Sequence, residues 1–326
     1  MERSAISSST QHTNPYEEVT ADYIDLHFRG SPRVIATPVL SGPDGVTLID
    51  PGPTSCLPAL EAGLRDRGLS LRDVCTLLLT HIHLDHAGAT GTILERVPAV
   101  RVYVHEIGAP HMADPEKLLA SATRLWGDQM DALWGAFLPV PRSQMTALAG
   151  GERLELAGRS LRVAYTPGHA KHHVSFLDEQ SGMAYVGDTA GIRVSGDYML
   201  APTPAPDIDI ETWQQSLDQI DAWQPVSLFL SHFGPVTPAR AHLARYRSVL
   251  TAQAEAVREL LHSGHTEEER IRIFADQLRK AARQRLPATE ARATELAAPF
   301  EQLWYGLARY WQKKGSAVPG FRGSGS

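Results

Sequence analysis

The residues best suited to chemistry lie in one short segment, THIHLDH at positions 80–86, directly after the apolar run 75–79. Imidazole nitrogens and carboxylate oxygens are ligands that zinc accepts, and at the end of a buried strand they would be poorly solvated without a metal. In an extended segment His81 and His83 point one way, whereas Asp85 and His86 begin the next turn. This short segment can therefore serve two neighbouring ions.

Three further residues, His169, Asp188 and His232, each follow a β-branched or apolar run. In a layered α/β fold such residues lie on loops at one edge of a sheet, where a rigid scaffold can hold a site. Seven ligands suit two ions that share a carboxylate, because one tetrahedral zinc needs only four. Asp178, in the turn-like stretch 178–182, and Asp197, in a loop, are the alternatives to Asp188.

Other residues near these ligands have more than one possible role. His172 and His173 either contact ligands or substrate or simply begin a polar strand, and the pattern slightly favours the polar strand. His173, Thr80 and Tyr198 are nevertheless our candidates for residues that support the ligands or line the pocket.

The elements that must position these residues are strands with interleaved helices. The sequence predicts strands at 34–40 and 46–50 joined by a hairpin turn at 42–45, and a helix at 57–67 that ends at Gly68. A helix at 90–96, a strand at 100–105 and short strands between 151 and 186 follow. Strands therefore occur on both sides of the ligand loops.

The whole pattern closely resembles the metallo-β-lactamase-fold hydrolase superfamily: a His-x-His-x-Asp-His motif, a later His, Asp and His, and an earlier strand that ends in Asp-x-Gly at 50–52. The resemblance covers roughly 23–239 and implies an α/β fold, an αββα sandwich of two facing sheets with helices outside. Each metal would take three unshared ligands: His81, His83 and His169 for the first, and Asp85, His86 and His232 for the second. Asp188 would bridge the metals, and Asp50 would support ligands without binding a metal.

The expected chemistry is hydrolysis. Two zinc ions roughly 3.5 to 4 Å apart lower the pKa of a shared water toward about 7, so the expected nucleophile is a metal-bound hydroxide, and Asp85 would orient it or relay its proton. Iron or manganese would also suit these ligands. We expect cleavage of a carboxylic ester, thioester or lactone, with phosphodiester or phosphotriester hydrolysis as the alternative, because the same hydroxide attacks phosphorus.

Several narrower activities of the family are disfavoured. The chain has no convincing counterpart of the basic glutathione-binding segment of hydroxyacylglutathione hydrolases, and Asp188 stands where true β-lactamases generally carry Cys or Ser. No Tyr follows Asp188 closely, as it does in acyl-homoserine lactonases. An iron redox enzyme is disfavoured because its dedicated members replace the second histidine of the motif with Glu. A noncatalytic metal-stabilised binding protein is also disfavoured, because the ligand set is complete.

We expect four segments along the chain: a flexible N-terminal segment at 1–20, a catalytic domain at 21–239, a C-terminal helical extension at 240–315, and a flexible, linker-like tail at 316–326. A helical insertion at 114–141 places Trp126, Met130, Trp134 and Phe137 on one predicted helix face. Such a stripe favours core packing or a subunit interface over a wall or lid above the metals. The loop 191–209, which contains Tyr198, is expected to shape the pocket.

The composition limits the classes of partner that the protein is expected to bind. The 326 residues carry a formal net charge of -6, which gives no broad cationic surface for nucleic acid or anionic membranes. We expect a small-molecule substrate, and a homo-oligomer is left open. Cys56 and Cys75 are the only cysteines, too few for a disulfide framework and not spaced as zinc ligands. With no apolar stretch near the ~20 residues of a membrane helix and no apolar signal segment in 1–15, we expect a cytoplasmic protein.

Overall fold

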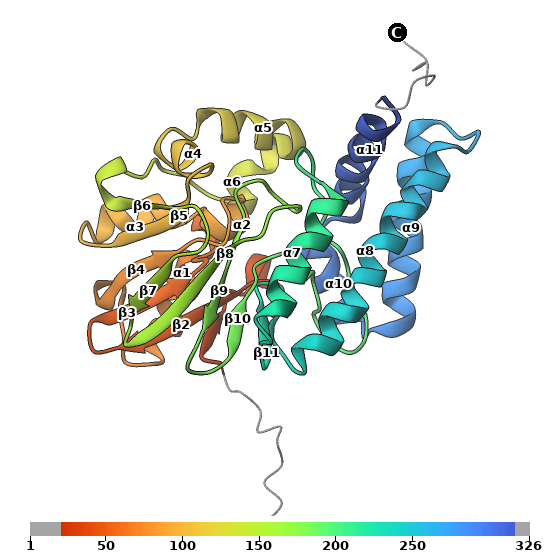
Figure 1. Ribbon diagram of the computed structural model, residues 1–326. Helices are drawn as coiled ribbons and strands as arrows, with labels where there is room; N and C mark the ends of the chain where they lie inside the picture. The colour runs from red at the N-terminus through yellow and green to blue at the C-terminus, as the bar shows by residue number, and fades with distance from the viewer. Residues whose placement is uncertain (1–20, 317–326) are drawn as a thin grey trace, which may run out of the picture.

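The computed structural model describes residues 21–316, and two six-stranded β-sheets form its centre (Figure 1). The strands of the first sheet lie side by side in chain order: β1 (Tyr23–Asp25), β2 (Ala36–Gly42), β3 (Gly45–Ile49), β4 (Val74–Leu78), β5 (Arg101–His105) and β6 (Met145–Leu148). The first three strands pair antiparallel, and β3 to β6 pair parallel. The predicted hairpin at 42–45 is present, with Gly42 opposite Gly45.

The second sheet has its strands in reverse chain order: β12 (Gly234–Val236), β11 (Ser227–Leu230), β10 (Met183–Tyr185), β9 (Val174–Asp178), β8 (Arg159–Tyr165) and β7 (Arg153–Leu156). Only one pair, β10 with β11, is parallel among these strands. Because parallel neighbours end at the same edge of a sheet, the residues that follow β10 and β11 are brought together, as are those that follow β3 and β4.

Alternation along the strands explains how the layers pack. Leu78 and Ile49 belong to the apolar core between the two sheets, together with Phe176 and Phe229 of the second sheet. Their neighbour Leu77 instead joins the larger core between the sheets and the helices. Since successive side chains of a strand point to opposite faces, burial of both faces requires the continuous apolar runs that the sequence shows.

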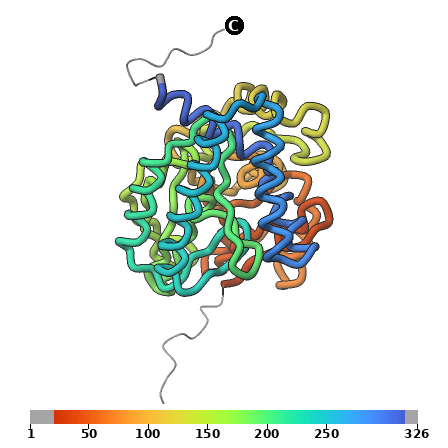
Figure 2. The backbone as a smooth tube through the Cα atoms, turned by 90° about the vertical axis from the view of Figure 1, so that its right-hand side faces the viewer, coloured from red at the N-terminus to blue at the C-terminus, as the bar shows by residue number. Residues whose placement is uncertain are grey.

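Helices surround the two sheets. They are α1 (Leu57–Arg65), α2 (Leu84–Ala87), α3 (Thr90–Arg96), α4 (Ala109–Ala113), α5 (Glu116–Trp126), α6 (Met130–Leu133), α7 (Ile210–Ala222), α8 (Ala239–Leu261), α9 (Glu267–Arg285), α10 (Ala288–Ala297) and α11 (Phe300–Ser316). Short 3₁₀ turns lie at η1 (Phe28–Gly30), η2 (Thr54–Cys56), η3 (Leu71–Asp73), η4 (Gly127–Gln129) and η5 (Arg142–Gln144). Helices α8 to α11 gather on one side of the sheets, the side that faces the viewer in Figure 2.

The C-terminal helices are well specified by their sequence. Thr266 and Glu269 form the reciprocal capping box that the sequence predicts at the start of α9. On α11, Phe300, Trp304 and Leu307 are buried, as their helical spacing predicts. The indole of Trp311 donates a hydrogen bond to a backbone carbonyl of α8, so α11 is joined to α8 by a polar contact as well as by packing.

The segment 114–141 differs from its prediction. The sequence places Trp126, Met130, Trp134 and Phe137 on one helix face, but α5 ends at Trp126 because Gly127 adopts a φ of 54°. A 3₁₀ turn and the four-residue α6 follow, and Phe137 lies outside any helix. The aromatic side chains therefore come together because the chain changes direction after α5, and helical periodicity alone does not reveal this change.

The fold-class prediction is confirmed: two facing sheets carry helices outside, and C-terminal helices follow the sandwich. Within residues 21–316, no helix is both long and apolar enough to cross a membrane. The predictions for 1–20 and for most of the 316–326 tail lie outside the described residues.

Candidate metal centre

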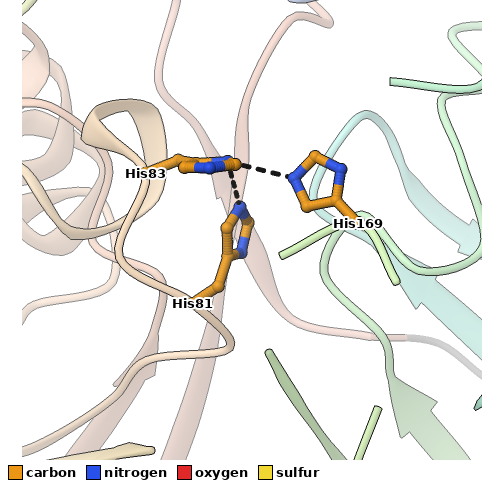
Figure 3. Close-up of side chains that lie close together, drawn as sticks. All are labelled: His81, His83 and His169. Atoms are coloured by element: carbon orange, nitrogen blue, oxygen red, sulfur yellow. Dashed lines mark hydrogen bonds between the residues drawn. The ribbon is translucent and has the colours of Figure 1, made fainter. Parts of the chain in front are cut away.

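Three histidines from two loops form a first cluster. His81 and His83 follow β4, and His169 lies between β8 and β9. The Nδ1 atom of His83 is 3.0 Å from Nε2 of His81 and 3.0 Å from Nε2 of His169 (Figure 3). All three rings therefore direct a nitrogen toward one point, which is the arrangement that a bound cation requires.

A second cluster joins Asp85 and His86, at the start of α2, with His232, which follows β11. One oxygen of Asp85 lies 3.5 Å from Nε2 of His86 and 3.3 Å from Nε2 of His232. The two imidazoles are buried, whereas the carboxylate of Asp85 remains 21% exposed and lines a cavity. Asp85 therefore connects the buried cluster to the space where a ligand can enter.

Asp188 lies between the two clusters. Its Oδ2 atom is 3.3 Å from Nε2 of His169, and its Oδ1 atom is 3.4 Å from Nε2 of His86 and 3.6 Å from Nε2 of His232. Gly187 makes this position accessible: its φ is 47°, and a Cβ there would lie 2.5 Å from the hydroxyl oxygen of Thr80. The neighbouring glycine thus permits the close approach that places one carboxylate against both clusters.

Hydrogen bonds on the far side of the rings fix which nitrogen is free in the second cluster. Asp50 is fully buried and accepts from the backbone N–H and hydroxyl of Thr80 and from the hydroxyl of Ser231. The same carboxylate lies 2.9 Å from Nδ1 of His86, which must donate to it. In the neutral ring, Nε2 of His86 therefore has its lone pair directed toward the cluster.

The same logic fixes the tautomer of the other rings. The hydroxyl of Thr80 donates to Asp50, so it can only accept from Nδ1 of His81, 3.0 Å away. Nδ1 of His169 donates to the carbonyl of Pro202, and Nδ1 of His232 donates to the carbonyl of Val34. In the neutral form of each ring, Nε2 therefore carries the lone pair and can bind a cation.

Buried polar atoms without partners support the fit of a metal. Nε2 of His86, Nε2 of His232 and Oδ1 of Asp188 are buried and have no hydrogen-bond partner among the described residues. Leaving such atoms unsatisfied costs on the order of 1–3 kcal/mol each, and a shared cation would satisfy all three. Asp50, which also lies near His81 and His86, is a poor candidate ligand because its oxygens already accept four hydrogen bonds.

The charges of the site depend on burial and proximity. Burial and the neighbouring His169 lower the pKa of His83 to about 4, so this ring is neutral at pH 7. Burial opposes ionisation of Asp85, but the charges of His86 and His232 outweigh it and lower the pKa of this carboxyl to about 2. For His86, burial works against the cation, yet the carboxylates of Asp85 and Asp188 raise its pKa. A metal would replace this proton as the positive charge between the carboxylates.

The remaining site predictions have mixed outcomes. Thr80 and Asp50 lie directly behind the ligands. His173 is buried, and its Nε2 accepts the backbone N–H of Asp188 at 3.3 Å, so it supports the backbone of Asp188. The prediction for Tyr198 is wrong: its hydroxyl donates to the carbonyl of Leu278 in α9, and the side chain does not line the cavity. The loop beside the ligands folds so that this ring packs on the C-terminal helices.

The two alternatives to Asp188 lie elsewhere. Asp178 ends β9 and accepts hydrogen bonds from the backbone N–H groups of Gln180 and Ser181, as a turn residue does. Asp197 is 80% exposed and pairs with Arg245. Neither carboxylate belongs to a cluster of metal-binding groups among the described residues.

A cavity of about 450 Å³ opens onto both clusters. Five of the predicted ligands line it: His83, Asp85, His169, Asp188 and His232. Its walls come from α5, from the loop 202–207 and from 296–303 of α10 and α11. Trp126 and Trp134 both face it, so the interpretation of the aromatic stripe as core or interface is incomplete: these residues also form the cavity wall.

His172 is a site residue that the sequence interpretation undervalues. It lines the cavity next to His83, with ring centroids 5.6 Å apart, instead of simply starting a polar strand. Its Nδ1 accepts the backbone N–H of Ile82 at 3.3 Å, so the neutral ring carries its proton on Nε2. The sequence predicts that the C-terminal helices close one side of the pocket, and they do so at 296–303. No local signal marks the individual lining residues, because they reach the site only through packing of distant segments.

Comparisons with known proteins identify the family and agree with the fold. The family model of the metallo-beta-lactamase superfamily matches residues 34–266. The metallo-beta-lactamase fold-containing protein ST1585 of Sulfurisphaera tokodaii is 30% identical over 165 residues, which are 50% of this chain and 61% of that protein. A hydroxyacylglutathione hydrolase from a Synechococcus species is 30% identical over 151 residues, 46% of this chain and 47% of that enzyme. The chain thus spans about half to three fifths of the length of these two relatives.

Solved structures show the same architecture. The crystal structure of ST1585 superimposes with a TM-score of 0.62 at 20% identity and covers 88% of this chain and 97% of that chain. The metallo-beta-lactamase family protein TTHA1429 from Thermus thermophilus gives a TM-score of 0.62 at 25% identity and covers 86% of this chain and 89% of that chain. Because the family model covers well over half of the sequence, the chain belongs to the metallo-β-lactamase superfamily of hydrolases, whose fold implies bound metal ions.

Proposed function

We propose that this chain is a dinuclear metal-dependent hydrolase of a carboxylic ester, thioester or lactone. The observation that carries the proposal is the position of Asp188, with one oxygen against His169 and the other against His86 and His232. A carboxylate placed in this way can bridge two cations and complete a set of seven ligands. Zinc is the proposed metal because it binds imidazole and carboxylate ligands and prefers four ligands in a tetrahedral arrangement. Iron and manganese are the alternatives.

Two zinc ions bound at these clusters would supply an activated water at neutral pH and a Lewis acid for the scissile carbonyl. The chain's own residues would do the rest. The low pKa of Asp85 keeps its carboxylate ionised, which suits orientation of the water better than storage of a proton. His172 lines the cavity, and the N–H at its Nε2 would be the donor that binds an oxygen of the substrate.

The lining of the cavity supports carboxylic substrates over phosphoesters. It is mostly apolar, and the lysines that line it are Lys117 and Lys171, of which Lys171 pairs with Asp207 at 3.2 Å. No arginine lines the cavity in the part of the chain that the structure describes. An anionic phosphodiester would favour several cations in fixed positions. A relative named hydroxyacylglutathione hydrolase agrees with a thioester or ester substrate.

The test is a metal-defined activity screen of the full chain. Zinc-loaded protein is assayed with p-nitrophenyl acetate, an acyl thioester, a γ-lactone and bis(p-nitrophenyl) phosphate. We expect turnover of at least one carboxylic substrate and about two metals per chain by elemental analysis. Turnover of the phosphodiester alone, or a protein that binds metal but cleaves none of the four substrates, would overturn the proposal.

A matched pair of variants tests the role of Asp188. The Asp188→Asn variant should lose metal and more than about a hundredfold in kcat/KM, because loss of a supporting group alone costs 10–100-fold. Asp197→Asn makes the same chemical change at an exposed position outside the metal clusters and should match wild type. Equal activity and metal content in the two variants would contradict the bridging role.

A further inference from the structure

The cavity above the metal clusters is large and apolar. Its volume of about 450 Å³ corresponds to roughly fifteen water-sized groups at about 30 Å³ each. Apolar side chains from four separate segments line it: Phe28, Leu118, Leu125, Trp126, Trp134 and Leu303. A small acyl group such as acetyl would leave most of this space in contact with water, which is unfavourable for so many apolar groups.

The opening of the cavity is apolar too. Among the described residues, four large hydrophobic side chains are exposed, and two of them, Ile107 at 41% and Leu125 at 37%, line this cavity. Single exposed apolar residues are common, but two at one opening that leads to a deeper apolar wall indicate a binding surface. A ligand that covers them must itself carry apolar surface.

The walls are held in place by contacts with the rest of the protein. The ring of Trp134 stacks on Phe28 with centroids 5.5 Å apart, and the carbonyl of Trp134 accepts the backbone N–H of Ser55. At the wall formed by α11, the hydroxyl of Thr203 donates to the carbonyl of Leu303 at 2.9 Å. These contacts tie the insertion and the C-terminal helices to the sandwich, so the cavity is formed before any ligand binds.

We propose that the substrate carries a bulky apolar group of about eight to twelve carbon atoms, held in this cavity while its scissile bond lies at the Asp188 end. The proposal rests on the hydrolase function proposed above and adds the substrate class. The number of carbon atoms follows from the cavity volume, which holds roughly fifteen water-sized groups. Part of that volume must hold the reacting carbonyl and its water, and the apolar group takes the rest. Lipophilic acyl esters or thioesters of medium chain length fit this description.

The first experiment measures chain-length dependence with the zinc-loaded full chain. Across p-nitrophenyl esters from acetate to palmitate, kcat/KM should rise by up to about fourfold for each added methylene, which corresponds to about 0.8 kcal/mol, and level off near eight to twelve carbons. A kcat/KM that does not change with chain length would overturn the inference while leaving the hydrolase proposal intact.

Cavity-filling variants locate the apolar group. Ser121 on α5 and Ala297 on α10 line the cavity from two separate segments and are partly buried, so Ser121→Phe and Ala297→Phe should shift the preferred chain length down and lower kcat/KM for decanoate esters far more than for acetate esters. Thr123→Phe places the same side chain on α5 at an exposed position that does not line the cavity, and it should behave as wild type. Two walls are tested so that misfolding of one variant does not decide the result.

A binding measurement separates the two proposals. Calorimetry should show that decanoate binds at least tenfold more tightly than butyrate, and that Ser121→Phe and Ala297→Phe weaken decanoate binding whereas Thr123→Phe does not. If decanoate binds in this way but no ester is hydrolysed, the apolar binding site is supported and the hydrolase function is rejected. Hydrolysis of short esters with no preference for decanoate over butyrate would reject the apolar site.

Discussion

Replacement of Asp50 by asparagine should weaken metal binding although Asp50 is not a proposed ligand. The oxygen of Asp50 nearest His86 accepts three hydrogen bonds, from His86, from the hydroxyl of Thr80 and from the hydroxyl of Ser231. In Asp50→Asn, an amide that keeps the bond to the backbone N–H of Thr80 presents its NH₂ group at this position. The Nδ1–H of His86 then faces a donor, and the ring is driven to the tautomer that carries its proton on Nε2.

The expected loss of metal affinity follows from the proton on Nε2 of His86. Nε2 of His86 must be deprotonated to bind a cation, so metal affinity should fall by about 10–100-fold, or roughly 1.4 to 2.8 kcal/mol. The loss should concern the cluster of Asp85, His86 and His232 more than that of His81, His83 and His169. Competitive titration of zinc against a chromophoric chelator measures both affinities, and elemental analysis gives the metal content.

Asp178 provides a matched control. It is also fully buried and accepts four hydrogen bonds, from Arg159, from the amide of Gln180 and from both the amide and the hydroxyl of Ser181, but it belongs to neither metal cluster. Asp178→Asn should destabilise the fold without changing metal affinity. If Asp50→Asn binds two zinc ions with wild-type affinity, the tautomer argument is wrong.

Three further outcomes are expected. Gly187→Ala should lose bound metal and melt at a lower temperature, since its Cβ would lie 2.6 Å from Nε2 of His173, and wild-type metal content by elemental analysis would contradict this. His172→Phe should cost about fivefold to tenfold in kcat/KM at unchanged metal content, because it removes an N–H donor, and unchanged steady-state kinetics would refute the role. Burial lowers the pKa of His242 from 6.5 to about 4. As the pH drops from 6.5 toward 4, the unfolded chain therefore binds a proton at His242 that the folded chain does not, and the free energy of unfolding falls by up to about 3 kcal/mol. In urea unfolding at pH 7.5 and 4.5, His242→Gln should lose less stability than wild type, and an equal loss would contradict the assignment.

The ligand loops can be predicted because the signals are local. Each candidate ligand follows an apolar run within a few residues, and the structure shows why this suffices. Because β3 pairs parallel with β4, and β10 with β11, Asp50 meets Thr80 and Asp188 meets His232 at the same edge. The helix predicted at 90–96 has the observed bounds for a similar reason, since its periodic residues are contiguous.

The pocket cannot be predicted to the same extent because its walls are non-local. The position of Tyr198 in a loop after Asp188 predicts a place near the pocket, but the loop directs this ring onto α9. Leu303 has no such signal, because its contact with Thr203 joins residues a hundred positions apart and leaves no mark on local periodicity. The break at Gly127 does have a signal, a glycine within an apolar stripe, and here the glycine outweighs the stripe.

The position of the metals tests the account most directly. Anomalous diffraction at the zinc edge from crystals of the zinc-loaded chain should show two peaks roughly 3.5 to 4 Å apart. One peak should be bound by His81, His83 and His169 and the other by Asp85, His86 and His232, with Asp188 in contact with both. A single fully occupied peak at wild-type activity, or metal bound away from Asp188, would contradict the dinuclear centre.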